Sequence, residues 1–209
     1  ERLEEFVNNG GTLVTTYWSG IVDENDLCFL GGFPGPLKKV TGIWAEELDA
    51  LYDEDVNYVS IEEGNSLGMK GEYEARIFCD LIHSEGAEVL ATYKTDFYKG
   101  MPVLTCNNFG EGQAYYIAFR NNDEFLSDFY SSLAKKLTLK RAIEIDLPKG
   151  INAQVRMDEK NEFVFFMNFS SEEKTIDIKD LDLTDMVTGE KVTKEMEIEP
   201  YGVRIVRRK

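Results

Sequence analysis

The chain has 209 residues, with 39 acidic and 23 basic side chains, so its formal net charge at pH 7 is −16. Such an acidic chain repels phosphate backbones and anionic lipids, which argues against nucleic acid and membrane surfaces as partners. Its hydrophobic fraction of 43% is enough for a folded core. No apolar run approaches the roughly 20 residues that a membrane-spanning helix needs, and the charged first residues are not a signal peptide.

Three cysteines lie far apart in the sequence, at Cys28, Cys79 and Cys106. An odd and scattered set is neither a disulfide framework nor a zinc site, so we expect no metal and no cofactor. It favours a reducing, cytoplasmic compartment. The chain begins without Met and inside an amphipathic helix, from which we expect a piece of a longer or processed protein.

The first segment of the chain predicts a helix, a glycine stop and a buried strand. Residues 1–9 end a helix, two glycines follow, and the β-branched run 12–18 predicts a strand that ends on Trp18. Three glycines and two prolines at 31–36 indicate a loop. A helix is expected at 44–52, because apolar side chains share one face there at helical spacing: Trp44, Leu48, Leu51 and Tyr52.

The next segments alternate in a way that favours strands. These strands are predicted at 56–61, 72–84, 87–93, 101–106 and 113–119. A helix follows at 125–137, and Asn122 or Asp123 can cap its start. After about residue 142 the pattern changes to short strands and turns only. We therefore predict an α/β domain with an open sheet over residues 1–142, followed by a small all-β antiparallel sandwich over residues 143–209.

A search for catalytic motifs finds none. No Gly-x-Ser-x-Gly elbow is present. The single histidine, His83, would lie about 13 Å from Cys79 along a strand, too far for a Cys–His pair, so we expect a structural role for it. The sequence GEG at 110–112 lacks the third glycine of a dinucleotide site and leads into a strand, which indicates a hairpin turn. No spacing selects two carboxylates for glycoside hydrolysis.

Four aromatic residues carry the most apolar area without an assigned role: Tyr17, Trp18, Phe33 and Trp44. Trp18 ends its predicted strand, and open α/β sheets bind ligands at the carboxyl ends of their strands. Core packing is the simplest interpretation of these side chains. A sugar-stacking platform and a subunit contact stay open as alternatives, because Trp and Tyr are enriched in both.

Several segments, in order, resemble glycoside hydrolase family 42 β-galactosidases. In the first two-thirds they are GGTLVTTYWSGIVDE (10–24), LGGFPGPL (30–37), GIWAEE (42–47), GAEVLATY (86–93) and DFYKGMPVLTCNNFGEG (96–112). In the last third they are FFMNF (165–169), DMVTGE (185–190) and PYGVR (200–204). Together they cover essentially the whole chain, and they are specific jointly rather than singly.

This resemblance implies a fold and a division of labour. Proteins of the family carry an N-terminal (β/α)₈ barrel with both catalytic glutamates of a retaining mechanism, then a trimerisation domain, then a small β domain. The trimerisation domain has a class I glutamine-amidotransferase-like, flavodoxin-like α/β fold without the Cys–His–Glu machinery. This sequence has no barrel, so the resemblance implies no catalytic residue here and no activity of this chain alone.

The same resemblance implies partners. We expect a homotrimer, and contact with β-galactosides only through the barrel of the parent protein. Trp18 becomes the candidate for a residue near the rim of a neighbouring subunit's active site. Two alternatives are kept: a stand-alone carbohydrate-binding module, favoured by the β domain and the aromatic residues, and an amidotransferase-like enzyme, which the missing nucleophile motif argues against.

Overall fold

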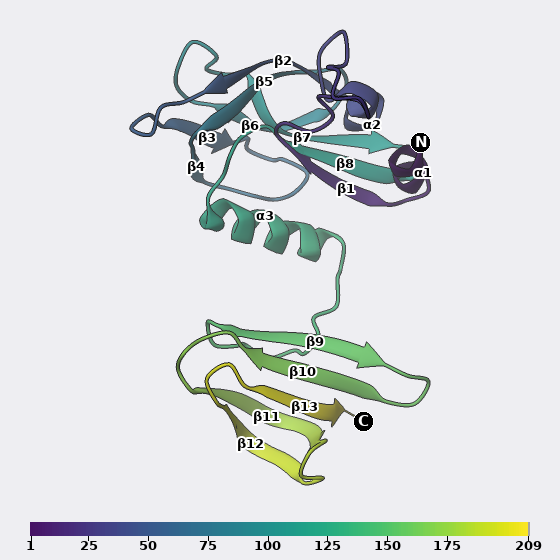
Figure 1. Cartoon of the computed structure of the whole chain (residues 1–209), viewed down its shortest axis with the longest axis vertical. Helices are drawn as coiled ribbons and strands as arrows, with labels where there is room; N and C mark the ends of the chain where they lie inside the picture. The colour runs from purple at the N-terminus through teal and green to yellow at the C-terminus, as the bar shows by residue number, and fades with distance from the viewer. Residues whose placement is uncertain (209) are drawn as a thin grey trace. The chain divides into compact units, whose positions relative to one another are not determined.

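Figure 1 shows the computed structural model, which describes residues 1–208 and, for residues 179 and 180, the backbone alone. The chain divides into two compact units, the first spanning Glu1–Thr138 and the second beginning at Leu139. Each unit has its own cluster of buried apolar side chains. A separate core is what allows a domain to fold as a unit.

A six-stranded sheet forms the body of the first unit, with the strand order β1-β8-β7-β6-β3-β4. Strands β1 and β8 run parallel, and every other neighbouring pair of the described sheet is antiparallel. A separate ribbon pairs β2 with β5. The strands are β1 (Thr12–Thr16), β2 (Ile43–Ala50), β3 (Asn57–Ile61), β4 (Glu72–Ala75), β5 (Phe78–Ser84), β6 (Glu88–Tyr93), β7 (Pro102–Phe109) and β8 (Gly112–Ile117).

The ribbon is joined to the chain that leaves β8. The Asp80 N–H donates to the carbonyl oxygen of Ala118 at 2.7 Å, and the Arg120 N–H donates to that of Phe78 at 2.8 Å. Large side chains fill the space between ribbon and sheet, and the buried ones include Tyr93, Tyr116, Phe119 and Ile82. Two of these side chains contact β5 directly, because the Tyr93 hydroxyl donates to the Asp80 carbonyl oxygen and the Tyr116 hydroxyl donates to Asp80 Oδ2.

Three α-helices occur among the described residues of this unit: α1 (Arg2–Asn8), α2 (Lys38–Thr41) and α3 (Asp123–Lys136), with one 3₁₀ turn, η1 (Gly35–Leu37). The prediction of a helix near 125–137 is confirmed, and the Asn122 side chain caps it by accepting the Phe125 N–H at 2.9 Å. The Phe125 ring meets Tyr73 of β4 edge to face, with centroids 5.2 Å apart. Helix α3 thus packs on the six-stranded sheet.

The predicted flavodoxin-like, glutamine-amidotransferase-like α/β sheet is wrong. Such a sheet needs parallel strands that alternate with helices on both of its faces. Here β6, β7 and β8 follow one another as an antiparallel meander, and the helices of the described first unit have 7, 4 and 14 residues. The structure is mostly β-sheet. The opening helix-glycine-strand pattern is present, but it is not repeated along the chain.

The predicted helix at 44–52 is also wrong, because Ile43–Ala50 forms β2. The pairing of β2 with β5 shifts register between Ala45 and Glu47. Such a bulge interrupts the alternation of buried and exposed side chains, and the remaining apolar spacing resembles that of a helix. Similarly, the single strand expected at 72–84 is two strands, separated at Ile77, whose φ is +67°.

The second unit holds five antiparallel strands in one sheet, in the order β12-β11-β13-β10-β9. They are β9 (Ile151–Met157), β10 (Glu162–Asn168), β11 (Lys174–Asp185), β12 (Lys191–Ile198) and β13 (Val203–Arg208). The predicted sandwich is wrong, because a sandwich requires two sheets. Register shifts along the 12-residue β11 allow the single sheet to curl around its own core, which includes Phe166, Ile176 and Val206.

Across residues 1–208, no helix combines the length and the apolar character needed to cross a membrane.

Candidate functional site around Trp18

Trp18 lies two residues after the end of the parallel edge strand β1. The Tyr17 N–H still donates to the Ile117 carbonyl oxygen of β8, at 2.7 Å, so the pairing ends one residue before Trp18. The backbone of Trp18 then turns into the left-handed region, with φ +61°. This conformation costs a bulky residue about 1 kcal/mol or more, so surrounding contacts must hold it. The Trp18 side chain is 57% exposed.

Two contacts hold Trp18, and both come from β5. Its indole ring packs on Phe78, with ring centroids 5.1 Å apart. Tyr17 also packs on Phe78, at 5.9 Å. The Trp18 N–H donates to Asp80 Oδ2 at 3.3 Å. The exposed indole therefore packs against a paired strand of the ribbon.

Asp80 is the buried charge of this site. Its side chain is fully buried, and Oδ2 also accepts the Tyr116 hydroxyl at 2.7 Å. Burial raises the pKa of the Asp80 carboxyl to about 6, although the hydrogen bonds from Tyr116 and from the Trp18 N–H lower it. No motif in the sequence points to this residue. The signal was a single acidic residue inside the apolar run FCDLI at 78–82.

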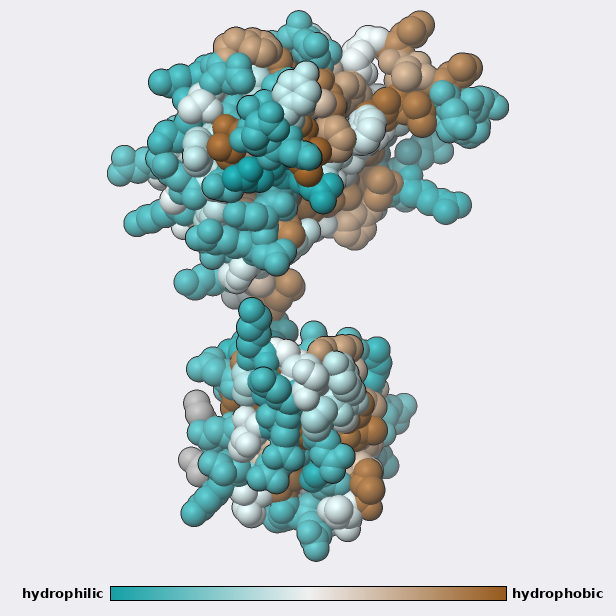
Figure 2. Space-filling model, turned by 60° about the vertical axis from the view of Figure 1, so that its left-hand side comes forward, coloured by the Kyte–Doolittle hydropathy of each residue, from teal (hydrophilic) through white to brown (hydrophobic). Residues whose placement is uncertain are grey.

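The segment after Trp18 exposes apolar side chains on an ordered backbone. Val22 bridges to Cys28, and Asp23 Oδ1 accepts the N–H groups of Asn25 and Leu27 at 2.8 and 3.0 Å. Leu27 is 65% exposed and Leu30 is 100% exposed. Figure 2 shows hydrophobic side chains, in brown, exposed on the first unit. We call residues 18–30 with these exposed side chains the apolar segment.

The other aromatic candidates lie elsewhere. Trp44 stacks on His83 of the facing strand, and the amine of Lys38 lies over its ring at 5.8 Å. Phe33 bridges Ala45 and packs against the core. Of the four aromatic residues, the structure brings Tyr17 and Trp18 together on Phe78.

Titratable and nucleophilic groups are dispersed. His83 Nε2 lies 2.9 Å from Glu46 Oε2, both at the surface. Cys79 and Cys106 are buried, and burial raises the pKa of the Cys79 thiol to about 11. Within residues 1–208 no three or more His, Cys, Asp or Glu side chains gather as a metal site would require.

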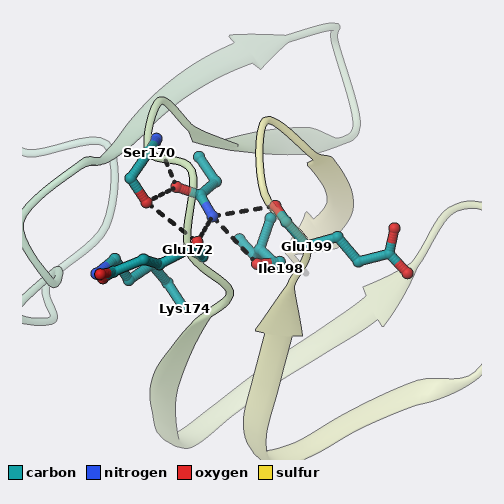
Figure 3. Close-up of polar contacts among 6 residues, drawn as sticks. Ser170, Glu172, Lys174, Ile198 and Glu199 are labelled. Atoms are coloured by element: carbon teal, nitrogen blue, oxygen red, sulfur yellow. Dashed lines mark hydrogen bonds and ion pairs between the residues drawn. The ribbon is translucent and has the colours of Figure 1, made fainter.

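A buried amide orders the turns of the second unit. The Asn168 Nδ2 donates to the carbonyl oxygens of Glu172, Ile198 and Glu199 at 2.7, 3.2 and 3.0 Å. Its Oδ1 accepts the N–H and hydroxyl of Ser170. Figure 3 shows these partners converging from the turn after β10 and from the end of β12. Every polar atom of this amide is used inside the fold, so its role is structural.

Asp185 forms a second buried polar centre of that unit. Its carboxylate accepts the N–H groups of Val187 and Thr188 and pairs with Arg204, whose Nη2 lies 2.7 Å away. Burial opposes the charge, but these donors, Thr188 first, lower the pKa of Asp185 below its usual value. The pocket beside it is lined by Thr188, Glu197 and Arg204.

An exposed aromatic side chain beside an ordered apolar segment is typical of a protein-interaction module. A family model described as the β-galactosidase trimerisation domain matches residues 1–140. A second, described as the β-galactosidase C-terminal domain, matches residues 150–208. The chain therefore belongs to glycoside hydrolase family 42, by its trimerisation and C-terminal domains.

Individual relatives agree with this family. β-Galactosidase Pbg of Clostridium perfringens is 98% identical over all 209 residues, and β-galactosidase BglY of Alicyclobacillus acidocaldarius is 46% identical over 208 residues. The crystal structure of β-galactosidase from Bacillus circulans sp. alkalophilus matches the whole chain with a TM-score of 0.89 and 42% identity, over 30% of its own length. The chain likewise spans 30% of the length of both curated relatives.

Proposed function

We propose that these 209 residues are the assembly and C-terminal part of a β-galactosidase, and that they shape an active site without performing the chemistry. The observation that carries this is the apolar segment, exposed within the domain whose family is described as trimerising. The chain alone is then inactive toward β-galactosides. Hydrolysis of a chromogenic β-galactoside by the purified chain, if it persisted through stringent repurification, would contradict this.

The division of labour follows the two units. We assign assembly to residues 1–142 and a separate C-terminal domain to residues 143–209. The division of the chain into two compact units, with the boundary between residues 138 and 139, supports this assignment. So do the two family matches. Expression of residues 1–142 alone tests it, since that piece should fold and self-associate without the rest.

We propose further that the apolar segment contacts other copies of the chain in a homotrimer. Symmetric contacts bury apolar surface, and the Leu30 side chain is fully exposed in the isolated chain. Leu30→Asp should therefore weaken self-association without disturbing the core. Val187→Asp, at a residue 85% exposed in the second unit, is the matched control. Sedimentation velocity should show a trimer for the unchanged chain and for the control, and smaller species for Leu30→Asp.

Trp18 is proposed to lie at the rim of a neighbouring subunit's active site. Its position after β1 and its exposure support this. In a full-length β-galactosidase that carries these residues, Trp18→Ala should raise KM more than it lowers kcat, because a rim residue binds substrate without touching the reacting atoms. Tyr52→Ala, which removes another exposed aromatic side chain of the first unit, should leave both parameters unchanged.

A carbohydrate-binding role has one observation in its favour. Phe169 and Tyr201 are both exposed, and the Tyr201 N–H donates to the carbonyl oxygen of Ser170, next to Phe169. Exposed rings are the usual stacking surface for sugars. Titration of the chain with galactose or lactose at millimolar concentration, followed by NMR, should shift signals of these two residues. An unchanged spectrum removes this alternative.

A reducing compartment, the cytoplasm, is the proposed location. Three free cysteines, two of them buried, support it. Mass spectrometry of the protein isolated from its cells, with thiols blocked at lysis, should find Cys28 reduced, and a disulfide there would contradict the proposal.

A further inference from the structure

Asp80 stands out because it is a buried acid inside an apolar strand. Its neighbours along β5 are Cys79, Leu81 and Ile82, and all four side chains are buried. Charged side chains are almost never fully buried unless they are paired. The hydrogen bonds of Asp80 come instead from a hydroxyl and a backbone amide, Tyr116 and Trp18. Through these two donors, Asp80 connects β5 with β8 and with the turn after β1.

The two carboxyl oxygens differ in what they contact. Oδ2 receives both hydrogen bonds, at 2.7 Å from the Tyr116 hydroxyl and 3.3 Å from the Trp18 nitrogen. Oδ1 is buried without a hydrogen-bond partner among the described residues. Burial of this carboxylate costs free energy, and two hydrogen bonds to Oδ2 are what compensates it among the described residues. One of them reaches the backbone of a residue held in the left-handed region.

We propose that Asp80 is a positioning residue for Trp18: its buried carboxylate holds the turn after β1, and so sets where the exposed indole stands, in a way that depends on the ionisation of Asp80. The carboxylate is the acceptor of the Trp18 N–H, and hydrogen bonds to an ionised acceptor are about twice as strong as neutral ones. A proton on Asp80 removes that advantage, and the turn loses part of what keeps it in its unfavourable conformation.

The surroundings of Asp80 leave it as the group that changes charge near neutral pH. The titratable side chains against it are the Tyr116 phenol of β8, the Tyr93 phenol of β6 and the Cys79 thiol of β5. Burial raises the pKa of each of these three, so all stay uncharged at pH 5–8. The pKa of Asp80 is raised to about 6 by burial, which puts its ionisation within a physiological range.

The experiment follows Trp18 directly. The chain has two tryptophans, so Trp44→Phe leaves Trp18 as the sole indole fluorophore. In this background, the Trp18 emission and its quenching by acrylamide should titrate with a midpoint near pH 6, with easier quenching on the acidic side. Asp80→Asn should abolish this titration. His83→Gln should leave it unchanged, which controls for the only histidine of the chain.

A second variant keeps the proposal testable if Asp80→Asn does not fold. Tyr116→Phe removes a hydrogen bond that lowers the pKa of Asp80, so the Trp18 midpoint should rise by about one pH unit. A midpoint that stays the same in Tyr116→Phe overturns the proposal. So does a titration that survives in Asp80→Asn, or an emission that is flat from pH 5 to pH 8.

The importance of this positioning for catalysis rests on the proposed function, and the two fail separately. In one outcome, the Trp18 emission changes with the ionisation of Asp80 while Trp18→Ala leaves the KM and kcat of the full-length enzyme unchanged. In that case the positioning role is supported and the rim role is contradicted. If Trp18→Ala raises KM but the pH dependence of the Trp18 emission is the same with and without Asp80, the rim role is supported and the positioning role is contradicted. If both hold, the KM of the full-length enzyme should follow the same midpoint, and Asp80→Asn should remove that dependence.

Discussion

The rings of Trp44 and His83 stack across β2 and β5, with centroids 4.6 Å apart and planes 15° from parallel. The two residues are direct partners in the strand register. The imidazole also reaches Glu46 at 2.9 Å. The single histidine of the sequence is thus part of a stacked cross-strand pair in the ribbon.

The first prediction concerns the energy of this pair. Trp44→Ala and His83→Ala should each lower the unfolding free energy of the first unit. The double variant should lower it by less than the sum of the two single losses. Cross-strand and stacked aromatic pairs suggest a coupling of about 0.5–1 kcal/mol. Urea unfolding of the four proteins of the cycle measures it. Strict additivity would mean that the stacking contributes nothing.

The pairing of Trp44 also explains why the sequence predicted the wrong element there. From one strand alone, the spacing of Trp44, Leu48 and Leu51 fits a helix. The structure contains a register shift between Ala45 and Glu47, and a shift of this kind depends on the partner strand β5. Local periodicity carries no information about a partner over 30 residues away. Helix α3, whose apolar stripe and Asn122 cap are local, could be predicted with its cap.

The second prediction concerns Gly112. The sequence GEG predicted a hairpin turn, and Phe109 and Gly112 do pair at the start of the β7–β8 hairpin. A methyl group on Gly112 would overlap the carbonyl oxygens of Val7 and Gly11, so helix α1 would have to move. Gly112→Ala should therefore cost about 3 kcal/mol of unfolding free energy.

The control for Gly112 is Gly64→Ala. Gly64 has φ +76° and open space around a new methyl group, so this change tests backbone strain alone. It should cost about 1 kcal/mol. Thermal unfolding ranks the two variants, and equal losses would show that the contact with α1 is not tight. The close approach to α1 is a tertiary contact that the GEG sequence does not encode locally.

The third prediction concerns Asn168. Its amide satisfies three carbonyl oxygens, and Asn168→Ala leaves them and the Ser170 N–H without that partner. Loss of these buried hydrogen bonds should destabilise the second unit by about 3 kcal/mol. Asn152→Ala, at an exposed residue of β9, is the control and should be nearly neutral. Hydrogen exchange of the amides of residues 151–208 separates this effect from the first unit.

The candidate site was only half predictable from the sequence. Trp18 was singled out as the aromatic residue that ends the predicted strand 12–18. In the structure β1 ends earlier, at Thr16, and Trp18 lies exposed two residues beyond it. Asp80 was missed because it lies 62 residues away in the sequence, and its role depends on the contact with the Trp18 backbone. One acidic residue in an apolar run gives a local signal of burial, but its partner is visible only in the fold.

The last prediction follows from the buried charge of Asp80. Its pKa is about 6 in the folded chain and 3.8 as an unperturbed carboxyl, so between these values the folded state binds a proton that the unfolded state lacks. Stability therefore falls as pH rises through this window, the reverse of a salt-bridged acid. The amide of Asp80→Asn does not bind a proton in this pH range, so it contributes no such pH dependence. The unfolding free energy of the unchanged chain should drop relative to the variant by on the order of 2 kcal/mol between pH 4 and pH 7.

Comparison of the two proteins at each pH cancels the contributions of the other acids, including Asp185, whose lowered pKa favours the folded state above pH 4. Chemical denaturation monitored by tryptophan fluorescence follows the first unit, because both tryptophans lie there. Parallel stability curves for the chain and for Asp80→Asn would show that Asp80 is not titrating inside the fold. The two curves should converge at acidic pH and separate toward neutral pH, apart from a constant offset caused by the amide itself. That result would confirm that the buried, ionised form of this carboxylate costs stability.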